Sequence, residues 1–188
     1  MGETEQRLRL RLATGEDIPA LRELIDVSVR VLQRADYSAE QLEAALGTAY
    51  GVDTQLITDG TYYVVEAVTG AGEKVFAACG GWSMRKTLYG SDHGPHRDSG
   101  LLDPAQDAAK IRAFFVHPEW VRCGIATLIL KTCEDTAYAR GFRRFEMGAT
   151  LTGVPMYAAR GYVKGEEIDV PLPGGLSLKV VRMSKRVA

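Results

Sequence analysis

The feature that most constrains this chain is a short apolar segment that runs into a long amphipathic pattern. Residues 111–116, Ile-Arg-Ala-Phe-Phe-Val, are rich in aromatic and β-branched side chains, and Pro118 follows them closely. This combination predicts a buried strand that ends before the proline. Small or apolar side chains then recur three and four residues apart, which places them on one face of a helix that Gly141 ends. They are Ile125, Leu128, Ile129, Cys133, Thr136 and Ala137.

The turn between this strand and this helix suits a phosphate group. The first amides of a helix lack intrahelical partners, and the helix dipole adds partial positive charge there. Gly124 and Ala126 are small, so a pyrophosphate can approach the backbone closely, and Arg122 adds a cation. The alternative is an ordinary turn in which glycine only relieves crowding. On spacing alone, both interpretations stay open.

Residues 116–126, Val-His-Pro-Glu-Trp-Val-Arg-Cys-Gly-Ile-Ala, resemble the acyl-CoA-binding signature of the GCN5-related N-acetyltransferases, the GNAT superfamily. In that family Gln or Arg, two free positions, Gly, one free position and Gly or Ala follow a central strand. Gly124 and Ala126 match, whereas Val121 departs from the Gln or Arg position and Arg122 comes one residue later. The resemblance implies that backbone amides of this turn bind acetyl-CoA. The cofactor-binding residues that it implies are Phe115, Val116, Val121, Arg122, Cys123, Gly124, Ile125, Ala126 and Thr127.

A second signature of the same family follows downstream. Residues 152–162 resemble its short helix that ends in Tyr, three residues, Gly and an aromatic, here Tyr157, Gly161 and Tyr162. The resemblance implies that Tyr157 faces the CoA sulfur and acts as the general acid for the leaving thiolate. Without the resemblance, a packed tyrosine whose hydroxyl bonds to the backbone is the favoured interpretation. The resemblance spans roughly residues 7–186.

The resemblance also implies the fold. We expect an α+β, α/β-sandwich architecture: a mixed, mostly antiparallel central sheet with splayed central strands and flanking helices. It would form a single domain over residues 1–188, with residues 1–6 loose. The residue patterns agree, because they predict helices that begin at 18 and 38 and a bulge or close approach at Gly80-Gly81. The remaining predicted strands are 8–12, 61–68, 74–84, 143–150, 163–170 and 176–183.

Composition narrows the possible functions. The 188 residues carry a formal net charge of −1, so a dedicated nucleic-acid binder is not expected. No apolar run is long enough to cross a membrane and no signal-peptide pattern opens the chain, which favours a cytoplasmic protein without a membrane partner. A homodimer is possible, because related proteins often dimerise through late strands. Tyr37, between the first two predicted helices, either lines a substrate pocket or packs internally.

Neither a disulfide framework nor a metal site is expected. The three cysteines, Cys79, Cys123 and Cys133, are an odd number without paired spacing. Cys79 and Cys133 fall in apolar patterns and are expected to be buried, while an acyl-cysteine at Cys123 is disfavoured because the family transfers acyl groups directly. His93 and His96 occur in the long polar segment 85–109, but their spacing matches no known metal cage.

The implied chemistry is acetyl transfer from acetyl-CoA to a primary amine of a small molecule or peptide. Charge that develops on the thioester oxygen needs a donor, which by family analogy is the backbone N–H of Val116 or a neighbour. Strand 111–116 lacks the carboxylate that many relatives use as a base. The alternative function is a non-catalytic acyl-CoA-binding sensor. Candidate bases that remain are Glu66, Glu146, Asp103, His117 and a water chain.

Overall fold

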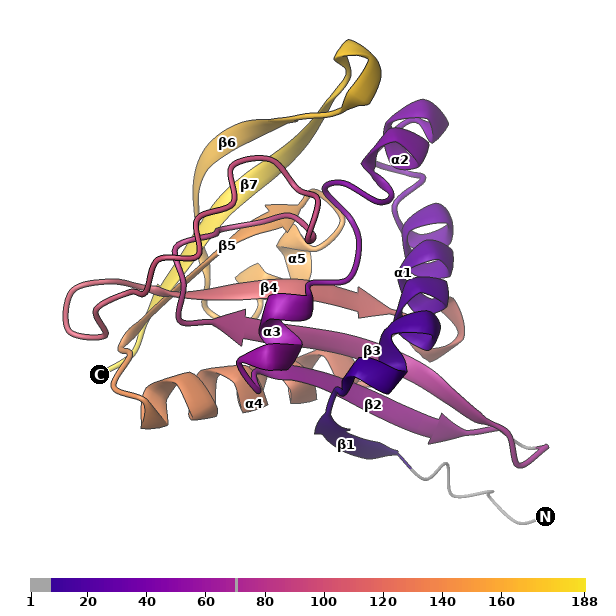
Figure 1. Cartoon of the computed structure of the whole chain (residues 1–188), viewed down its shortest axis with the longest axis horizontal. Coiled ribbons are helices and arrows are strands. Elements are labelled where there is room, and N and C mark those ends of the chain that lie inside the picture. The colour runs from indigo at the N-terminus through magenta and orange to yellow at the C-terminus, as the bar shows by residue number, and fades with distance from the viewer. Residues whose placement is uncertain (1–7, 70) are drawn as a thin grey trace.

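The computed structural model describes residues 8–69 and 71–188, so the prediction of a loose N-terminal stretch, 1–6, lies outside the described residues. The described strands form a seven-stranded sheet in the order β1-β2-β3-β4-β5-β7-β6 (Figure 1). All neighbouring strands run antiparallel except β4 and β5, which are parallel, and this confirms the mixed sheet that was expected. The strands are β1 Arg9–Leu12, β2 Tyr62–Val68, β3 Lys74–Ser83, β4 Ala109–Val116, β5 Arg144–Thr150, β6 Val163–Pro171 and β7 Ser177–Arg186.

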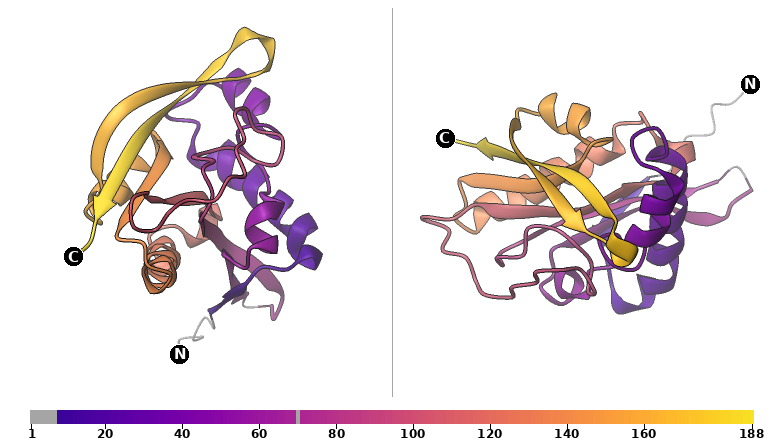
Figure 2. Two further views of the ribbon diagram at one scale, coloured as in Figure 1. Left: turned by 60° about the vertical axis from the view of Figure 1, so that its left-hand side comes forward. Right: turned by 90° about the horizontal axis from the view of Figure 1, so that it is seen from above.

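Helices cover both faces of the sheet, with a hydrophobic core on each side. Alternation along β2 divides the two cores, because Tyr62 and Val64 pack toward α1 and α2, whereas Tyr63 and Val65 pack toward α4. Figure 2 shows α1 and α4 on opposite sides of the strands. The helices are α1 Ile18–Leu32, α2 Ala39–Ala45, α3 Thr54–Thr58, α4 Ile125–Ala139 and α5 Val154–Ala158, with 3-10 turns η1 Gly15–Asp17, η2 Pro118–Trp120 and η3 Pro173–Gly175.

The buried face of α4 differs in one respect from the predicted stripe. Leu128, which the spacing placed on the same face as Ile125 and Ile129, is 45% exposed, and Leu130 is buried instead. At about 100° per residue, the buried stripe runs from Ile125 to Ala137; Leu130 lies only about 20° beyond the Ala137 edge, whereas Leu128 lies about 60° beyond the Ile125 edge. The alternation predicted for β5 is confirmed, since Phe145, Met147 and Ala149 are all buried.

The two central strands separate soon after they meet. β4 and β5 pair only at Ala109↔Phe145 and Lys110↔Glu146, and an ion pair between Lys110 and Glu146 spans the same end. Beyond this point β4 stays with β3, while β5 pairs with β7 along its whole length. The strands therefore open a wedge toward their carboxyl ends, which confirms the predicted splay.

Local signals predicted the first helices well. Ser38 and Gln41 form the expected capping box at the start of α2, with bonds of 3.1 and 2.9 Å. Tyr37 is buried, donates to Lys179 O and accepts from Leu151 N–H, so the packing interpretation of this residue is confirmed. The β6–β7 hairpin extends toward α2 (Figure 2), and Gln41 Nε2 of α2 donates to Ser177 O at 2.8 Å.

The long segment 86–108 contains no helix or strand, as expected from its composition. It folds back on itself through bonds such as Thr87 N–H to Asp98 O, and it contacts α3 where Thr54 N–H donates to Asp92 Oδ1. Helix α3 itself was not predicted, because five residues are too few to show a helical period. Among the helices of residues 8–69 and 71–188, none is both long enough and apolar enough to span a bilayer.

Candidate active site

The turn after β4 has the geometry of an anion-binding loop. η2 follows β4, and residues 121–127, the amide loop below, lead into the first turn of α4. Arg122 and Gly124 both have left-handed backbone conformations, with φ of +62° and +76°. A turn of this kind can gather successive N–H groups into a concave nest that binds anions. Glycine suits position 124 because it adopts this conformation without steric cost.

The amide groups of this loop are available to a ligand. Within the described part of the chain, the N–H groups of residues 122–127 donate to no backbone or side-chain acceptor, and Leu128 N–H is the first to do so, to Gly124 O at 3.0 Å. A Cβ placed on Gly124 would meet nothing within 4 Å. Ile125 is buried and anchors the helix, whereas Arg122, Cys123 and Gly124 are exposed. The loop therefore presents free donors and the positive end of α4 to solvent, which fits a pyrophosphate.

A second cation joins Arg122 at this loop. Arg160, from the turn after α5, donates from Nε and Nη2 to Thr127 Oγ1 at 3.1 and 3.0 Å. Arg160 lies inside the second signature, yet its place beside α4 depends on the packing of α5 and was not predicted. Val121, at the position where the family carries Gln or Arg, is partly exposed, and the Cys123 thiol lies 3.5 Å from its carbonyl oxygen.

Strand β4 carries a bulge at the mouth of the wedge. Its register with β3 shifts between Cys79 and Gly81, and Ala113 has a φ of +56°, which is rare for a residue other than glycine. Gly80 is required opposite the bulge, since a Cβ there would lie 2.7 Å from the ring of Phe114. Of the two alternatives predicted at Gly80-Gly81, the close approach is confirmed, while the extra residue of the bulge lies on β4 opposite Gly80.

The predicted oxyanion donor, Val116, has a partner in this structure. Its N–H donates to Ser28 Oγ of α1 at 3.3 Å, which is long for an N–H···O bond. The next amide, His117 N–H, belongs to the β3 ladder through Ala77 O at 2.8 Å. A ligand oxygen at Val116 would share or replace the Ser28 contact, so this assignment stays a prediction.

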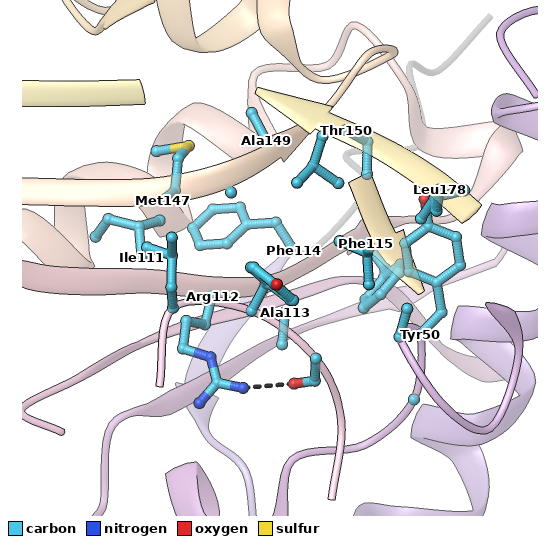
Figure 3. Close-up of a pocket in the computed structure, with 18 of the residues that line it drawn as sticks. Tyr50, Ile111, Arg112, Ala113, Phe114, Phe115, Met147, Ala149, Thr150 and Leu178 are labelled. Atoms are coloured by element: carbon cyan, nitrogen blue, oxygen red, sulfur yellow. Dashed lines mark hydrogen bonds between the residues drawn. The ribbon is translucent and has the colours of Figure 1, made fainter. Parts of the chain in front are cut away.

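A cavity of about 90 Å³ fills the wedge between β4 and β5. This wedge cavity is lined by residues 111–115 of β4, 147–150 of β5, Tyr157 of α5 and the loop segments 49–51 and 88–90, with Val170, Leu178 and Val180 from the last hairpin. Figure 3 shows Ile111 and Met147 at one end and Tyr50 and Leu178 at the other. Of the predicted site residues, the structure brings Phe115 and Tyr157 together here and keeps residues 121–127 outside.

Tyr157 lies at the wall of the wedge cavity with a free hydroxyl. The residue is 7% exposed, and its ring packs edge-to-face against Phe114 and Tyr162 at 6.2 and 6.0 Å between centroids. Within residues 8–69 and 71–188 its hydroxyl has no hydrogen-bond partner, whereas the Tyr162 hydroxyl donates to Glu134 at 2.9 Å. Burial raises the pKa of Tyr157 above its usual value, so the phenol stays protonated at neutral pH. The ring is packed, but the hydroxyl is not tied to the backbone.

Comparison with known families agrees with this geometry. Residues 99–170 match the family model of the acetyltransferase (GNAT) domain, a stretch that holds β4, the amide loop, α4, β5 and Tyr157. This part of the chain is therefore similar to the GNAT domain. No curated protein matches the chain.

Solved structures show the same fold over all or nearly all of this chain. A GCN5-related N-acetyltransferase from Rhodopseudomonas palustris is 24% identical, with a TM-score of 0.66 and coverage of 100% of this chain and 99% of its own. The PaiA N-acetyltransferase from Thermoplasma acidophilum, solved with coenzyme A, is 13% identical over 96% and 99%, with a TM-score of 0.62. The putative acetyltransferase YncA from Salmonella typhimurium, solved with acetyl-CoA, is 15% identical over 96% and 94%, with a TM-score of 0.59.

The four residues that the sequence offered as candidate bases have other roles. Glu66 pairs with Arg11 at 2.7 Å, and Glu146 pairs with Lys110 and Arg182. In the described structure none of the four candidates lines the wedge cavity. The other two also act locally: His117 Nδ1 accepts from Glu119 N–H, and Asp103 Oδ1 accepts from Ala105 N–H. A base that acts inside the cavity is therefore not among them.

The cysteines of this chain are distributed as predicted. Cys79 and Cys133 are buried and Cys123 is exposed. Burial raises the pKa of Cys79 to about 12, so this thiol stays protonated and is unsuited to nucleophilic attack. Across residues 8–69 and 71–188, no group of three or more His, Cys, Asp or Glu side chains could hold a metal ion, and His93 and His96 belong to no such group.

Proposed function

We propose that this protein is an acetyl-CoA-dependent N-acetyltransferase that transfers the acetyl group directly to a primary amine. The observation that carries the proposal is Tyr157, a buried residue that lines the wedge cavity and whose hydroxyl has no hydrogen-bond partner within residues 8–69 and 71–188. A hydroxyl without a protein partner is available as a donor to a ligand atom in the cavity. The acceptor is an amine of a small molecule or peptide.

The amide loop fits the pyrophosphate of acetyl-CoA. Its N–H groups are free, Gly124 leaves room above the backbone, and Arg122 and Arg160 add charge. When bound, acetyl-CoA supplies an acetyl thioester that is activated for attack by an amine. The complexes of the Thermoplasma and Salmonella proteins with coenzyme A and acetyl-CoA support this choice of donor.

The chain's own residues would act on charge and protons around the reacting carbonyl. Tyr157 holds a proton for the departing thiolate, a role typically worth about two to four decades in rate. The Val116 N–H would donate to the carbonyl oxygen as negative charge develops there, and one such donor is worth about 3 kcal/mol. No carboxylate lines the described cavity, so the amine must arrive neutral or lose its proton to water.

A non-catalytic acyl-CoA sensor is the second candidate. The observation that favours it is the lack of a carboxylate along β4 and around the wedge cavity. The free Tyr157 hydroxyl speaks against it, because a protein that only binds the cofactor needs no proton donor there. A sensor that binds only acyl-CoA would also have no need for a wedge cavity with room for a second substrate.

Release of free thiol from acetyl-CoA, measured across a panel of amines with and without the protein, tests the proposal. Acetyl-CoA binding is measured in parallel by calorimetry. Saturable release with one class of amine is the expected result. Micromolar binding without release for free amines, protein N-termini or lysine peptides would contradict catalysis and favour the sensor.

A further inference from the structure

The wedge cavity contains a single charged residue among its described walls, and that residue is a cation. Arg112 lies in the middle of β4 and is 4% exposed. The other lining side chains are aliphatic, aromatic or small, with three tyrosines and one threonine as their polar members. A cavity with a buried positive charge and no acid among its described walls disfavours a second cation and favours an anion.

The charges around Arg112 are only partly balanced. Its Nη2 lies 2.7 Å from Asp53 Oδ2 and also donates to Gly90 O, the bond that the dashed line in Figure 3 marks. Asp53 is fully buried and also contacts Arg97 Nη2 at 3.2 Å, so two guanidinium groups share one carboxylate. Asp92, the next acid nearby, accepts from Thr54 N–H.

The Arg112 guanidinium still has a donor to offer. Its Nε is buried and has no hydrogen-bond partner within residues 8–69 and 71–188. Burial lowers the pKa of Arg112, which indicates that its present partners do not fully replace water. A guanidinium presents its N–H groups in a planar fork that matches a carboxylate, so an anionic ligand would satisfy what the protein leaves open.

The dimensions suit a small head group with a side chain beyond it. The wedge cavity measures about 90 Å³, and a second cavity of about 280 Å³ adjoins it through Tyr50 and Gly51. This outer cavity is lined by both signs of charge, with Arg22, Asp26, Asp92 and His93. An amine and a carboxylate close together would fill the inner space, and the rest of the molecule would extend into the outer one.

We propose that the acceptor is a free amino acid or a closely related amino carboxylate, and that Arg112 binds its carboxylate. This inference rests on the proposed acetyltransferase function, because it concerns the acceptor of that reaction. A polyamine would bring a second cation against Arg112. A peptide N-terminus would leave Arg112 without a carboxylate beside the amine.

The first test compares acids with their own amides. Alanine is paired with alaninamide and phenylalanine with phenylalaninamide, and putrescine serves as the diamine. Each rate is divided by the concentration of the neutral form of the amine, so that differences in amine pKa do not affect the comparison. We expect kcat/KM for each acid to exceed that of its amide at least tenfold. Equal rates for acid and amide, or a preference for putrescine, would overturn the proposal while upholding the acetyltransferase function.

Variants then assign the preference to Arg112. Arg112→Lys keeps the charge but loses the fork, and should raise the KM for the acid about tenfold. The double variant Arg112→Gln/Asp53→Asn removes both buried charges together and should bring the acid-to-amide ratio close to one. Arg85→Gln is the matched control, because Arg85 pairs with Asp59 at 2.7 Å in the same layer but does not line the wedge cavity.

A purely structural Arg112 predicts a different pattern. Its loss would then lower the rates with acid and amide together and leave their ratio unchanged, which would contradict the proposal. Calorimetry of alanine and alaninamide in the presence of coenzyme A separates this proposal from the acetyltransferase function. Arg112-dependent binding of alanine without turnover would support the anion site and contradict catalysis. Binding of neither compound would overturn the site.

Discussion

The amide loop and the wedge cavity are built on opposite principles. The amide loop is seven consecutive residues, 121–127, and offers mainly backbone N–H groups. The wedge cavity draws on segments that range from residue 49 to residue 180 and offers side chains. A site made of backbone depends on local conformation, whereas a site made of side chains depends on how distant elements pack. The two halves should therefore respond to different kinds of substitution.

The departure at Val121 illustrates this difference. A family position that usually carries Gln or Arg is apolar here, yet the amides around it are free and turned to solvent. The amide loop can do without a polar side chain at position 121 because its hydrogen-bond donors belong to the backbone. In the wedge cavity, by contrast, Tyr157 and Arg112 each contribute an atom that no neighbouring residue supplies.

The largest effect is expected from Tyr157→Phe. Removal of the hydroxyl keeps the ring and its contacts with Phe114 and Tyr162, but removes the proton donor. We expect kcat to fall about a hundredfold while the Kd for acetyl-CoA stays within twofold. Steady-state kinetics and calorimetry measure the two quantities.

Tyr162→Phe is the matched control for this substitution. Its hydroxyl bonds to Glu134 and lies outside the lining of the wedge cavity, so kcat should change less than threefold. Because burial raises the pKa of Tyr157 above the usual value of 10, kcat of the native protein should show no falling limb up to pH 10. An equal loss of kcat in both variants, or a decrease in kcat that begins below pH 9, would show that Tyr157 is not the proton donor.

The next effect tests the backbone character of the amide loop. A side chain at Gly124 must adopt a φ of +76°, at a cost of roughly 1–2 kcal/mol, and would also shield the amides. We expect Gly124→Val to raise the Kd for coenzyme A about ten- to thirtyfold and to leave kcat at saturation nearly unchanged. Titration calorimetry provides the measurement.

Gly174→Val controls for strain alone. Gly174 has nearly the same φ, +75°, and equally open surroundings, but it lies at the tip of the last hairpin. It should lose similar stability and keep its affinity for coenzyme A. Equal losses of affinity in the two variants would mean that strain, rather than the amides at position 124, determines binding.

The same contrast explains what could be predicted from the sequence. The capping box of Ser38 and Gln41, the alternation in β5 and the turn at Gly124 are set by neighbours in the chain, and all were predictable. Leu128 was misplaced because a pattern of three- and four-residue steps admits more than one stripe on a helix. These features involve interactions over a few residues.

The side chains that surround Arg112 could not be predicted from any local pattern in the sequence. Asp53 caps a helix too short for a periodic signal, and Arg97 lies in a segment without regular structure. Their meeting with Arg112 depends on how residues 86–108 fold over the sheet. Arg160 reaches Thr127 in the same way, through packing of α5 against the start of α4. Such contacts follow from tertiary structure, which spacing along the chain does not encode.

Gly80→Ala should disturb the wedge cavity through packing. The new methyl group would lie 2.7 Å from the ring of Phe114, which lines the cavity and contacts Tyr157. The ring must shift, and overpacking of this kind typically costs about 1–3 kcal/mol. We expect the acceptor KM to rise three- to tenfold while the Kd for coenzyme A stays within twofold. Gly165→Ala on β6 is the control, because a Cβ there would lie 3.2 Å from Arg182 O of β7, and a matched rise in KM would contradict a local cause.

The smallest effects are expected at the exposed cations of the amide loop. Arg122→Gln and Arg160→Gln should each raise the Kd for coenzyme A about two- to fivefold, because exposed charge pairs contribute only about 0.2–1 kcal/mol. The effect should shrink between 0.15 and 1 M salt, where the Debye length falls from about 8 to about 3 Å. Arg144 is an exposed arginine at the start of β5, where β4 and β5 are still paired, so Arg144→Gln should leave the Kd for coenzyme A unchanged. A loss of fiftyfold or more that persists at high salt would mean that side chains, rather than the backbone, bind the pyrophosphate, and the contrast between the two halves would fail.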